Sequence, residues 1–110
     1  MSRLSLETSL AGRTAVIALA GELDLAGVAA LERALAGVDA RAVVVDLRGL
    51  GFIDSSGLRT LAVAAQRAHR AGRRFALVPG AAHVMRVFDV TRMRERLEFV
   101  GDPGEVIVGP

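Results

Sequence analysis

The chain has 110 residues, of which 52% are hydrophobic and 24% charged, and it contains no cysteine, tryptophan or tyrosine. This composition is that of one globular domain, and the missing cysteines exclude disulfides, thiolate metal sites and cysteine nucleophiles. The formal net charge is only +2, the strongly basic residues are all arginine, and acidic residues are interspersed among them, so no direct contact with nucleic acid is expected.

The sequence offers no segment suited to membrane insertion. Its first ten residues lack the sustained apolar core of a signal peptide, and no apolar run approaches the roughly 20 residues that span a bilayer. We therefore expect a soluble cytoplasmic protein with no membrane partner.

A β-hairpin is predicted at the start of the chain. Residues 4–10 alternate apolar with polar side chains, as in a strand with one exposed face, and residues 15–20 form a second strand-like run. Gly12-Arg13 between the two runs predicts the turn. The segment 21–24 is expected to end the second strand.

A helix and then a buried strand are predicted next. Asp24 is a candidate N-cap, and apolar residues recur after it at helical spacing up to Gly37. Residues 42–47 (AVVVDL) form a nearly continuous apolar run, which is typical of a strand covered on both faces. We expect residues 48–53 to be a glycine-rich connection. The apolar positions of the predicted helix are Leu25, Val28, Leu31 and Leu35.

The remaining sequence continues to alternate between helices and strands, which gives the order β-β-α-β-α-β-α-β. Strands separated by helices predict parallel neighbours joined by right-handed crossovers, so we expect a single α/β domain. The further elements predicted are a helix over 56–71 with Gly72 as its stop, a strand over 75–78, a helix over 82–90, a short strand over 97–100 and an irregular tail over 103–110.

Two adjacent serines follow the buried strand at the start of a helix. Ligand-facing groups of open α/β sheets gather at such strand-to-helix turns. Ser55 or Ser56 would lie at the cap or in the first turn, where free backbone N–H groups and the helix dipole favour negative charge. A phosphate on that serine would find hydrogen-bond donors already in place.

The residues beside the serines allow two interpretations. Gly57 removes a side chain from the first turn, which would let the surface of another protein approach the hydroxyl, and Asp54 adds a carboxylate. Asp-Ser-Ser-Gly is equally an ordinary helix start with a serine as its cap. Residue types and spacing alone leave both interpretations open.

No catalytic or cofactor motif surrounds these serines. A nucleophile elbow needs a glycine two positions before the serine, and here Ile53 and Asp54 occupy those positions. A P-loop needs a lysine, which the chain lacks. His69 and His83 have no ligand-spaced cluster around them. We therefore expect no enzyme activity, no metal and no cofactor.

Four segments occur in the order and spacing of a known family, over about residues 4–102. They are Gly21-Glu22-Leu23-Asp24, VVVDLRGLGFIDSSGL, Phe75-Ala76-Leu77-Val78 and Arg86-Val87-Phe88, and the block Asp54-Ser55-Ser56-Gly57-Leu58 is the most specific. Through them the chain resembles the anti-sigma factor antagonists of the STAS domain family. The resemblance implies one STAS domain over residues 1–110, with a mixed four- or five-stranded sheet and helices mainly on one side.

The resemblance also implies a bacterial partner-switching cycle that regulates transcription. The unphosphorylated antagonist binds an anti-sigma factor that is also a serine kinase, and a sigma factor is released. The kinase then phosphorylates the antagonist, which abolishes binding, and a serine phosphatase resets it. By position in the motif the phosphorylated residue corresponds to Ser56. The expected partner-binding residues are Asp24, Asp54, Ser55, Ser56, Gly57 and Leu58.

A second interpretation of the same resemblance is a STAS module in another assembly. Such a module would be a scaffold or subunit of a stress-sensing or lipid-transport complex. Relatives of that kind often carry extra domains or lack the phosphorylatable serine. This chain has the serine within a single domain, which favours the antagonist.

Overall fold

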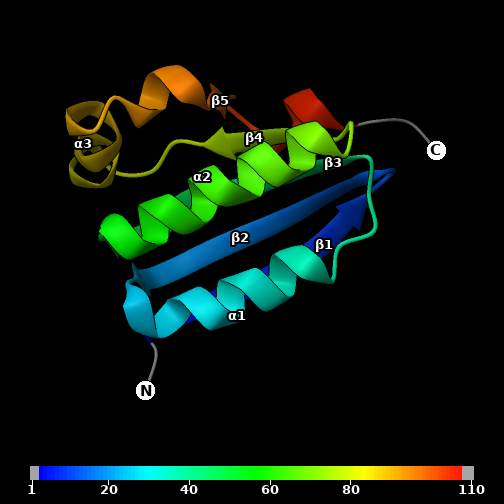
Figure 1. Cartoon of the computed structure of the whole chain (residues 1–110). Helices are drawn as coiled ribbons and strands as arrows, with labels where there is room; N and C mark the ends of the chain where they lie inside the picture. Colours follow the sequence, from blue (N-terminus) through cyan, green and yellow to red (C-terminus); the bar gives the residue numbers. More distant parts are fainter. Residues whose placement is uncertain (1–2, 108–110) are drawn as a thin grey trace.

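Within residues 3–107, which the computed structural model describes, five strands form one sheet and three helices cover one of its faces (Figure 1). The strands lie side by side in chain order; β1 (Leu4–Ala11) is antiparallel to β2 (Thr14–Leu23), and all later neighbours are parallel. The predicted α/β architecture is confirmed, with five strands. The other elements are α1 (Leu25–Ala36), β3 (Ala42–Ile53), α2 (Ser55–Arg70), β4 (Arg74–Val78), α3 (Ala82–Val90), β5 (Glu98–Phe99) and the 3₁₀ turns η1 (Met93–Arg96) and η2 (Pro103–Val106).

The second strand is longer than predicted. The expected break at residues 21–24 is wrong, because β2 continues through Gly21 to Leu23. Gly21 has a φ of +90°, which glycine adopts without steric cost, and a Cβ there would lie 2.1 Å from the carbonyl oxygen of Arg3. The close approach lets the chain before β1 pair with the end of β2.

The third strand also extends past its predicted end. The expected connection over residues 48–53 is wrong, because this segment is the second half of β3. The register with β2 shifts twice there, and at each shift β3 accommodates one extra residue. β3 is therefore buried at every residue from 42 to 47, and beyond them only at Leu50 and Ile53.

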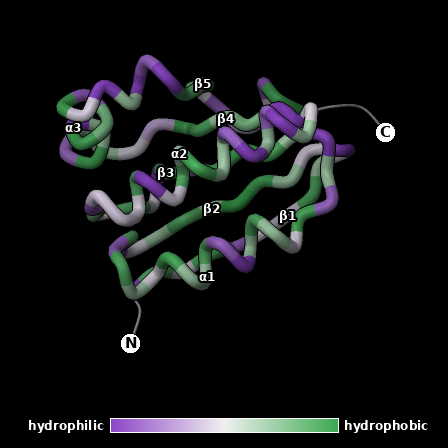
Figure 2. The backbone as a smooth tube through the Cα atoms, viewed as in Figure 1, coloured by the Kyte–Doolittle hydropathy of each residue, from purple (hydrophilic) through white to green (hydrophobic). Residues whose placement is uncertain are grey.

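The main hydrophobic core lies between the sheet and the helices. Ile17 and Leu19 of β2, Val45 of β3 and Leu61 of α2 are at most 1% exposed in it. Fully burying such a side chain stabilises the fold by roughly 1.5–3 kcal/mol. Hydrophobic and hydrophilic residues alternate along α1 and α2, as expected for helices with one face on this core (Figure 2). None of the helices in the described range is long and apolar enough to span a membrane.

A smaller cluster covers part of the helix-free face of the sheet. Val44 of β3 and Val78 of β4 are buried there together with Val106 of η2. The hydroxyl of Thr14 donates a hydrogen bond to the carbonyl of Val106 at 2.8 Å. Residues 103–106 are thus a packed 3₁₀ turn and not an irregular tail, whereas residues 108–110 of that predicted tail lie outside the described residues.

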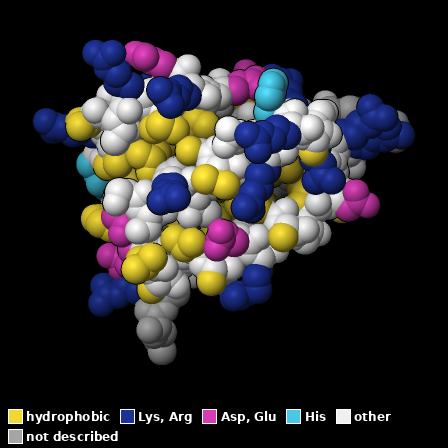
Figure 3. Space-filling view, in the orientation of Figure 1, with side chains coloured by type: hydrophobic (Ala, Val, Ile, Leu, Met, Phe, Trp, Pro, Cys, Tyr) yellow, Lys and Arg dark blue, Asp and Glu magenta, His cyan; other side chains and the backbone are white. Residues whose placement is uncertain are grey.

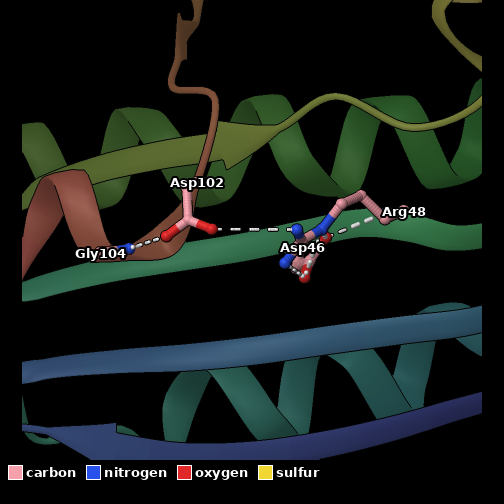
Figure 4. A network of polar contacts seen from close by, with 4 residues as sticks. All are labelled: Asp46, Arg48, Asp102 and Gly104. Carbon is pink, nitrogen blue, oxygen red and sulfur yellow. Dashed lines mark hydrogen bonds and ion pairs between the residues drawn. The ribbon is translucent and has the colours of Figure 1, made fainter.

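A polar network on the same face joins β3 to this turn (Figure 4). Arg48 donates to both oxygens of Asp46, with Nε–Oδ1 at 3.0 Å and Nη2–Oδ2 at 2.8 Å. Arg48 also lies 4.0 Å from Asp102, which accepts from the N–H of Gly104 at the start of η2. Burial alone would raise the pKa of Asp46, but the hydrogen bonds and positive charge of Arg48 outweigh it and lower that pKa.

Candidate functional site

The ends of two neighbouring parallel strands bring Asp24 and Asp54 together. Leu23 and Ile53 are register partners in β2 and β3, and each is followed directly by one of the aspartates. The N–H of Asp54 donates to the carbonyl of Leu23 at 3.2 Å. Parallel strands end at the same edge of a sheet, so residues far apart in the sequence become neighbours there.

Both aspartates cap the helices that follow them. Asp24 accepts from the N–H of Ala26 at 3.1 Å, and Asp54 accepts from the N–H of Gly57 at 3.0 Å. The N-cap predicted at Asp24 is therefore confirmed. At the second helix the cap is Asp54 and not a serine, which corrects the interpretation of a serine-capped helix start.

The two serines occupy the first two positions of α2. Ser55 is exposed and Ser56 is half-buried. Within the described residues, neither hydroxyl takes part in a hydrogen bond, and Thr60 bonds only the backbone carbonyl of Ser56. In the first turn of α2, the N–H of Gly57 donates to the side chain of Asp54 and the N–H of Leu58 to its carbonyl. Within the described residues, this leaves the N–H groups of Ser55 and Ser56 as unused donors. Both hydroxyls therefore lie beside unused donors at the positive end of the helix dipole.

Gly57 and Leu58, which follow the serines, pack α2 against the rest of the domain. A Cβ on Gly57 would lie 2.5 Å from Cγ and 2.8 Å from the carbonyl oxygen of Leu23. The missing side chain is thus required by the packing of α2 against β2 within the chain itself, which the sequence alone did not indicate. Leu58 is 6% exposed and belongs to the main core.

Two apolar side chains that sequence reasoning missed lie on the exposed part of the site. Leu25, expected on the inner face of its helix, is 73% exposed at the first position of α1. Phe52 is 45% exposed between the buried residues Leu50 and Ile53. The three-residue spacing between those two apolar positions is the signal that could have identified Phe52 as an exposed residue. We call the surface formed by Asp24, Leu25, Phe52, Asp54, Ser55 and Ser56 the serine end.

A hydrogen bond ties the third helix to the same edge of the sheet. His83, near the start of α3, lies with Nε2 2.6 Å from the carbonyl oxygen of Gly51 in β3. Glu22 adds another carboxylate beside Asp24 and pairs with Arg3 at 3.3 Å. The described residues contain no group of three or more metal-ligating side chains. The start of α3 is thus held at the same edge of the sheet as the two serines.

Comparison with known proteins agrees with this geometry. Among curated protein sequences none matches the chain. Solved structures that match its fold include an anti-sigma factor antagonist from Mycobacterium paratuberculosis (22% identity, 94% of this chain and 93% of that chain, TM-score 0.83) and SpoIIAA in two forms. The anti-sigma factor antagonist SpoIIAA matches in its unphosphorylated form with 21% identity over 93% of both chains and a TM-score of 0.74. Bacillus SpoIIAA matches in its phosphorylated form with 20% identity over 93% of this chain and 96% of that chain, and a TM-score of 0.68. The family model described as Mlab, STAS domain, matches residues 6–101, so the chain belongs to the STAS domain family.

Proposed function

We propose that this STAS domain is an anti-sigma factor antagonist switched by phosphorylation of Ser56. In its unphosphorylated form it binds an anti-sigma factor with serine-kinase activity. The observation that carries the proposal is a half-buried serine with a free hydroxyl in the first turn of α2, beside two capping aspartates, in a fold that matches anti-sigma factor antagonists. The role is regulatory and non-enzymatic, and it belongs in the bacterial cytoplasm, where sigma factors act.

The fold can accept a phosphate at this position without rearranging. Unused N–H groups of the first turn and the positive end of the α2 dipole stabilise an added negative charge. The phosphorylated and unphosphorylated forms of SpoIIAA both match this fold over more than nine-tenths of the chain, which supports a switch without refolding. We therefore expect the change to lie in affinity for the partner.

The same phosphate would oppose a close protein interface. It adds about −1.5 to −2 charges next to the carboxylates of Asp24 and Asp54, and it loses hydration when a partner covers it. The exposed side chains of Leu25 and Phe52 would contact that partner in the unphosphorylated state. A loss of about 3 kcal/mol, which one such charge can cause, weakens binding more than a hundredfold.

Phosphorylation is tested directly with the cognate kinase. The protein is incubated with the kinase and ATP, and the modified residue is identified by mass spectrometry in wild type, Ser56→Ala and Ser55→Ala. We expect one phosphate in wild type and in Ser55→Ala and none in Ser56→Ala. Phosphate on another residue, or undiminished phosphorylation of Ser56→Ala, contradicts the assignment.

The effect of charge at Ser56 on binding to the kinase is tested with a variant that mimics the phosphate. Ser56→Asp should bind the kinase at least tenfold more weakly than Ser56→Asn, a neutral change of the same size, while both keep the circular dichroism spectrum of wild type. A phosphatase should restore binding of the phosphorylated wild type. Equal binding by the two variants would show that charge at this position does not control the partner.

A further inference from the structure

The opposite edge of the sheet, where the parallel strands begin, brings together arginines that are distant in the sequence. The N–H of Arg41 donates to the carbonyl of Arg13 at 2.9 Å, and the N–H of Arg74 donates to the carbonyl of Arg41 at 3.2 Å. These three residues precede or open β2, β3 and β4, so their backbones are linked in a row across the edge. All three are exposed.

The end of α2 adds further arginines to this row. Arg67 and Arg70 lie in the last turn of the helix and are exposed, and Arg73 follows in the loop that leads to β4. We call Arg13, Arg41, Arg67, Arg70, Arg73 and Arg74 together the arginine end. In Figure 3 several basic side chains lie at the right of the molecule, the end where Figure 1 shows the β1–β2 turn and the C-terminal end of the described chain, and others lie elsewhere on this face.

Few acidic side chains neutralise this charge. Arg74 is paired with Glu98. Arg73 donates to the carbonyl of Val38 at 3.2 Å, so its positive charge is not compensated by that bond. Within the described residues, the other four arginines of the arginine end form no salt bridge.

The arginine end also contains a hollow lined by both charged and apolar side chains. The hollow has a volume of about 530 Å³, and Arg13, Arg41 and Arg73 line it together with one acidic residue, Asp39, and with Leu10. Leu10 is 69% exposed. An exposed apolar side chain beside several guanidinium groups is the pattern of a surface that meets both phosphate and hydrocarbon.

A second exposed apolar residue lies at the same end. Ile107 is 51% exposed, and it follows Val106, whose carbonyl accepts the hydrogen bond from Thr14 at the start of β2. None of the four phenylalanines lines this hollow, and Phe75, which directly follows Arg74, is only 9% exposed. Base stacking on aromatic rings is therefore not offered there.

We propose that the arginine end binds the surface of an anionic lipid bilayer, although the sequence led us to expect no membrane partner. The guanidinium groups contact lipid phosphates, one of which fits the hollow, while Leu10 and Ile107 enter the boundary between headgroups and acyl chains. The charge complementarity accounts for attraction to an anionic surface, and the two exposed apolar side chains favour a bilayer over a nucleic acid. The binding is peripheral and reversible, because two apolar side chains are a weak anchor.

The expected strength follows from the number of arginines. Each basic residue near an anionic membrane raises binding about fivefold, so the loss of three should reduce it roughly a hundredfold. Raising the salt concentration from about 0.05 M to about 0.5 M should release the protein, because the Debye length falls severalfold. The serine end faces away from the bilayer in this orientation, so the inference does not depend on the proposed function.

The test is sedimentation of the whole protein with lipid vesicles. We expect binding to phosphatidylcholine vesicles that contain phosphatidylglycerol, weak binding to pure phosphatidylcholine, and unchanged vesicle binding by Ser56→Asp. The triple variant Arg13→Gln, Arg41→Gln, Arg70→Gln should lose binding. The matched control Arg59→Gln, Arg86→Gln, Arg92→Gln removes the same charge elsewhere and should keep it, and Leu10→Ser should weaken vesicle binding about fivefold.

Three outcomes overturn the proposal. The first is the absence of binding by wild type to anionic vesicles at low salt. The second is equal loss in the two triple variants, which would show a response to net charge alone. The third is binding to a DNA or RNA homopolymer through the arginine end without binding to vesicles. Circular dichroism of each variant separates a loss of binding from a loss of fold.

Discussion

The serine end and the arginine end lie at opposite edges of one sheet and differ in the sign of their charge. The serine end presents Asp24 and Asp54 at the starts of two helices. The arginine end presents Arg67 and Arg70 at the close of one of them. Helices that connect parallel strands run opposite to the strands, so helix N-termini gather at one edge and C-termini at the other.

The helix dipole explains part of this difference. Acidic groups are stabilised near helix N-termini and basic groups near C-termini, each by about 0.3–1 kcal/mol. The dipole thus accounts for the two aspartates and for Arg67 and Arg70, whereas Arg13, Arg41 and Arg74 lie at the starts of strands. What distinguishes them is packing: the serine end rests on closely fitted backbone, whereas the arginine end is formed by exposed side chains.

The largest effect is expected where α2 contacts β2. Gly57→Ala places a methyl group 2.5 Å from Cγ of Leu23, and it should lower the free energy of unfolding by about 2 kcal/mol even though alanine favours the helix. Urea denaturation measures the change. Gly51→Ala is the control, because its Cβ would have no neighbour closer than 3.8 Å. Equal effects of the two changes would contradict the close fit at the serine end.

The capping aspartates should matter next. Asp54→Ala removes the acceptor for the N–H of Gly57 and should lower the free energy of unfolding by about 1 kcal/mol, as should Asp24→Ala at α1. Asp54→Asn keeps a capping oxygen without the charge, so it should cost only a few tenths of that amount. If Asp54→Asn nevertheless weakens kinase binding, the carboxylate acts in recognition as well as in capping; unchanged binding would limit it to the cap.

Acid should weaken the polar network of Asp46 and Arg48, which lies between the two ends. The lowered pKa of Asp46 means that its pairing with Arg48 stabilises the fold above the unfolded pKa of about 4, and that this contribution is lost as pH falls through the folded pKa. At neutral pH, Arg48→Met should be less stable than wild type, because it leaves the largely buried carboxylate of Asp46 without its partner. Urea denaturation should show the difference shrinking below pH of about 4.

The matched control is an exposed ion pair. Arg3→Met breaks the pair with Glu22, in which the arginine side chain is 81% exposed, and it should change stability little at any pH. A difference between Arg48→Met and wild type that stays constant down to low pH would mean that packing of the arginine, and not its charge, stabilises β3 against η2.

The smallest effect on stability is expected at the arginine end. The triple variant Arg13→Gln, Arg41→Gln, Arg70→Gln should unfold within about 0.5 kcal/mol of wild type, because these exposed side chains form no salt bridge within residues 3–107. Its phosphorylation by the kinase should proceed at the wild-type rate. A marked loss in either measurement would show that the two ends are coupled.

The helices and the order of the elements could be predicted because their signals are local. Asp24 and Gly72 mark a helix start and a helix stop through their own chemistry, and apolar spacing indicates the buried face between such marks. The length of β3 could not be predicted in this way. Its two register shifts break the alternation that identifies a strand, and its glycines resemble those of a loop.

The site was predicted in part for a related reason. Ser56 and both aspartates lie in short motifs, so their positions at helix starts could be anticipated. The exposure of Leu25 depends on where the edge of the sheet lies, which no local pattern encodes. The arginine end is formed from residues 13, 41 and 67–74, and only the pairing of β2, β3 and β4 makes them neighbours.

The backbone hydrogen bond between Glu22 and Arg3 determines what a fluorescent protein fused to the chain would obstruct. It keeps Arg3 beside the serine end, whereas the bond between Thr14 and Val106 keeps the other extremity of the described chain beside the arginine end. A fluorescent protein fused ahead of Arg3 would stand in the way of a kinase and leave a bilayer accessible. One fused after Ile107 would do the reverse, so a pair of fusions could report separately on the two surfaces in living cells.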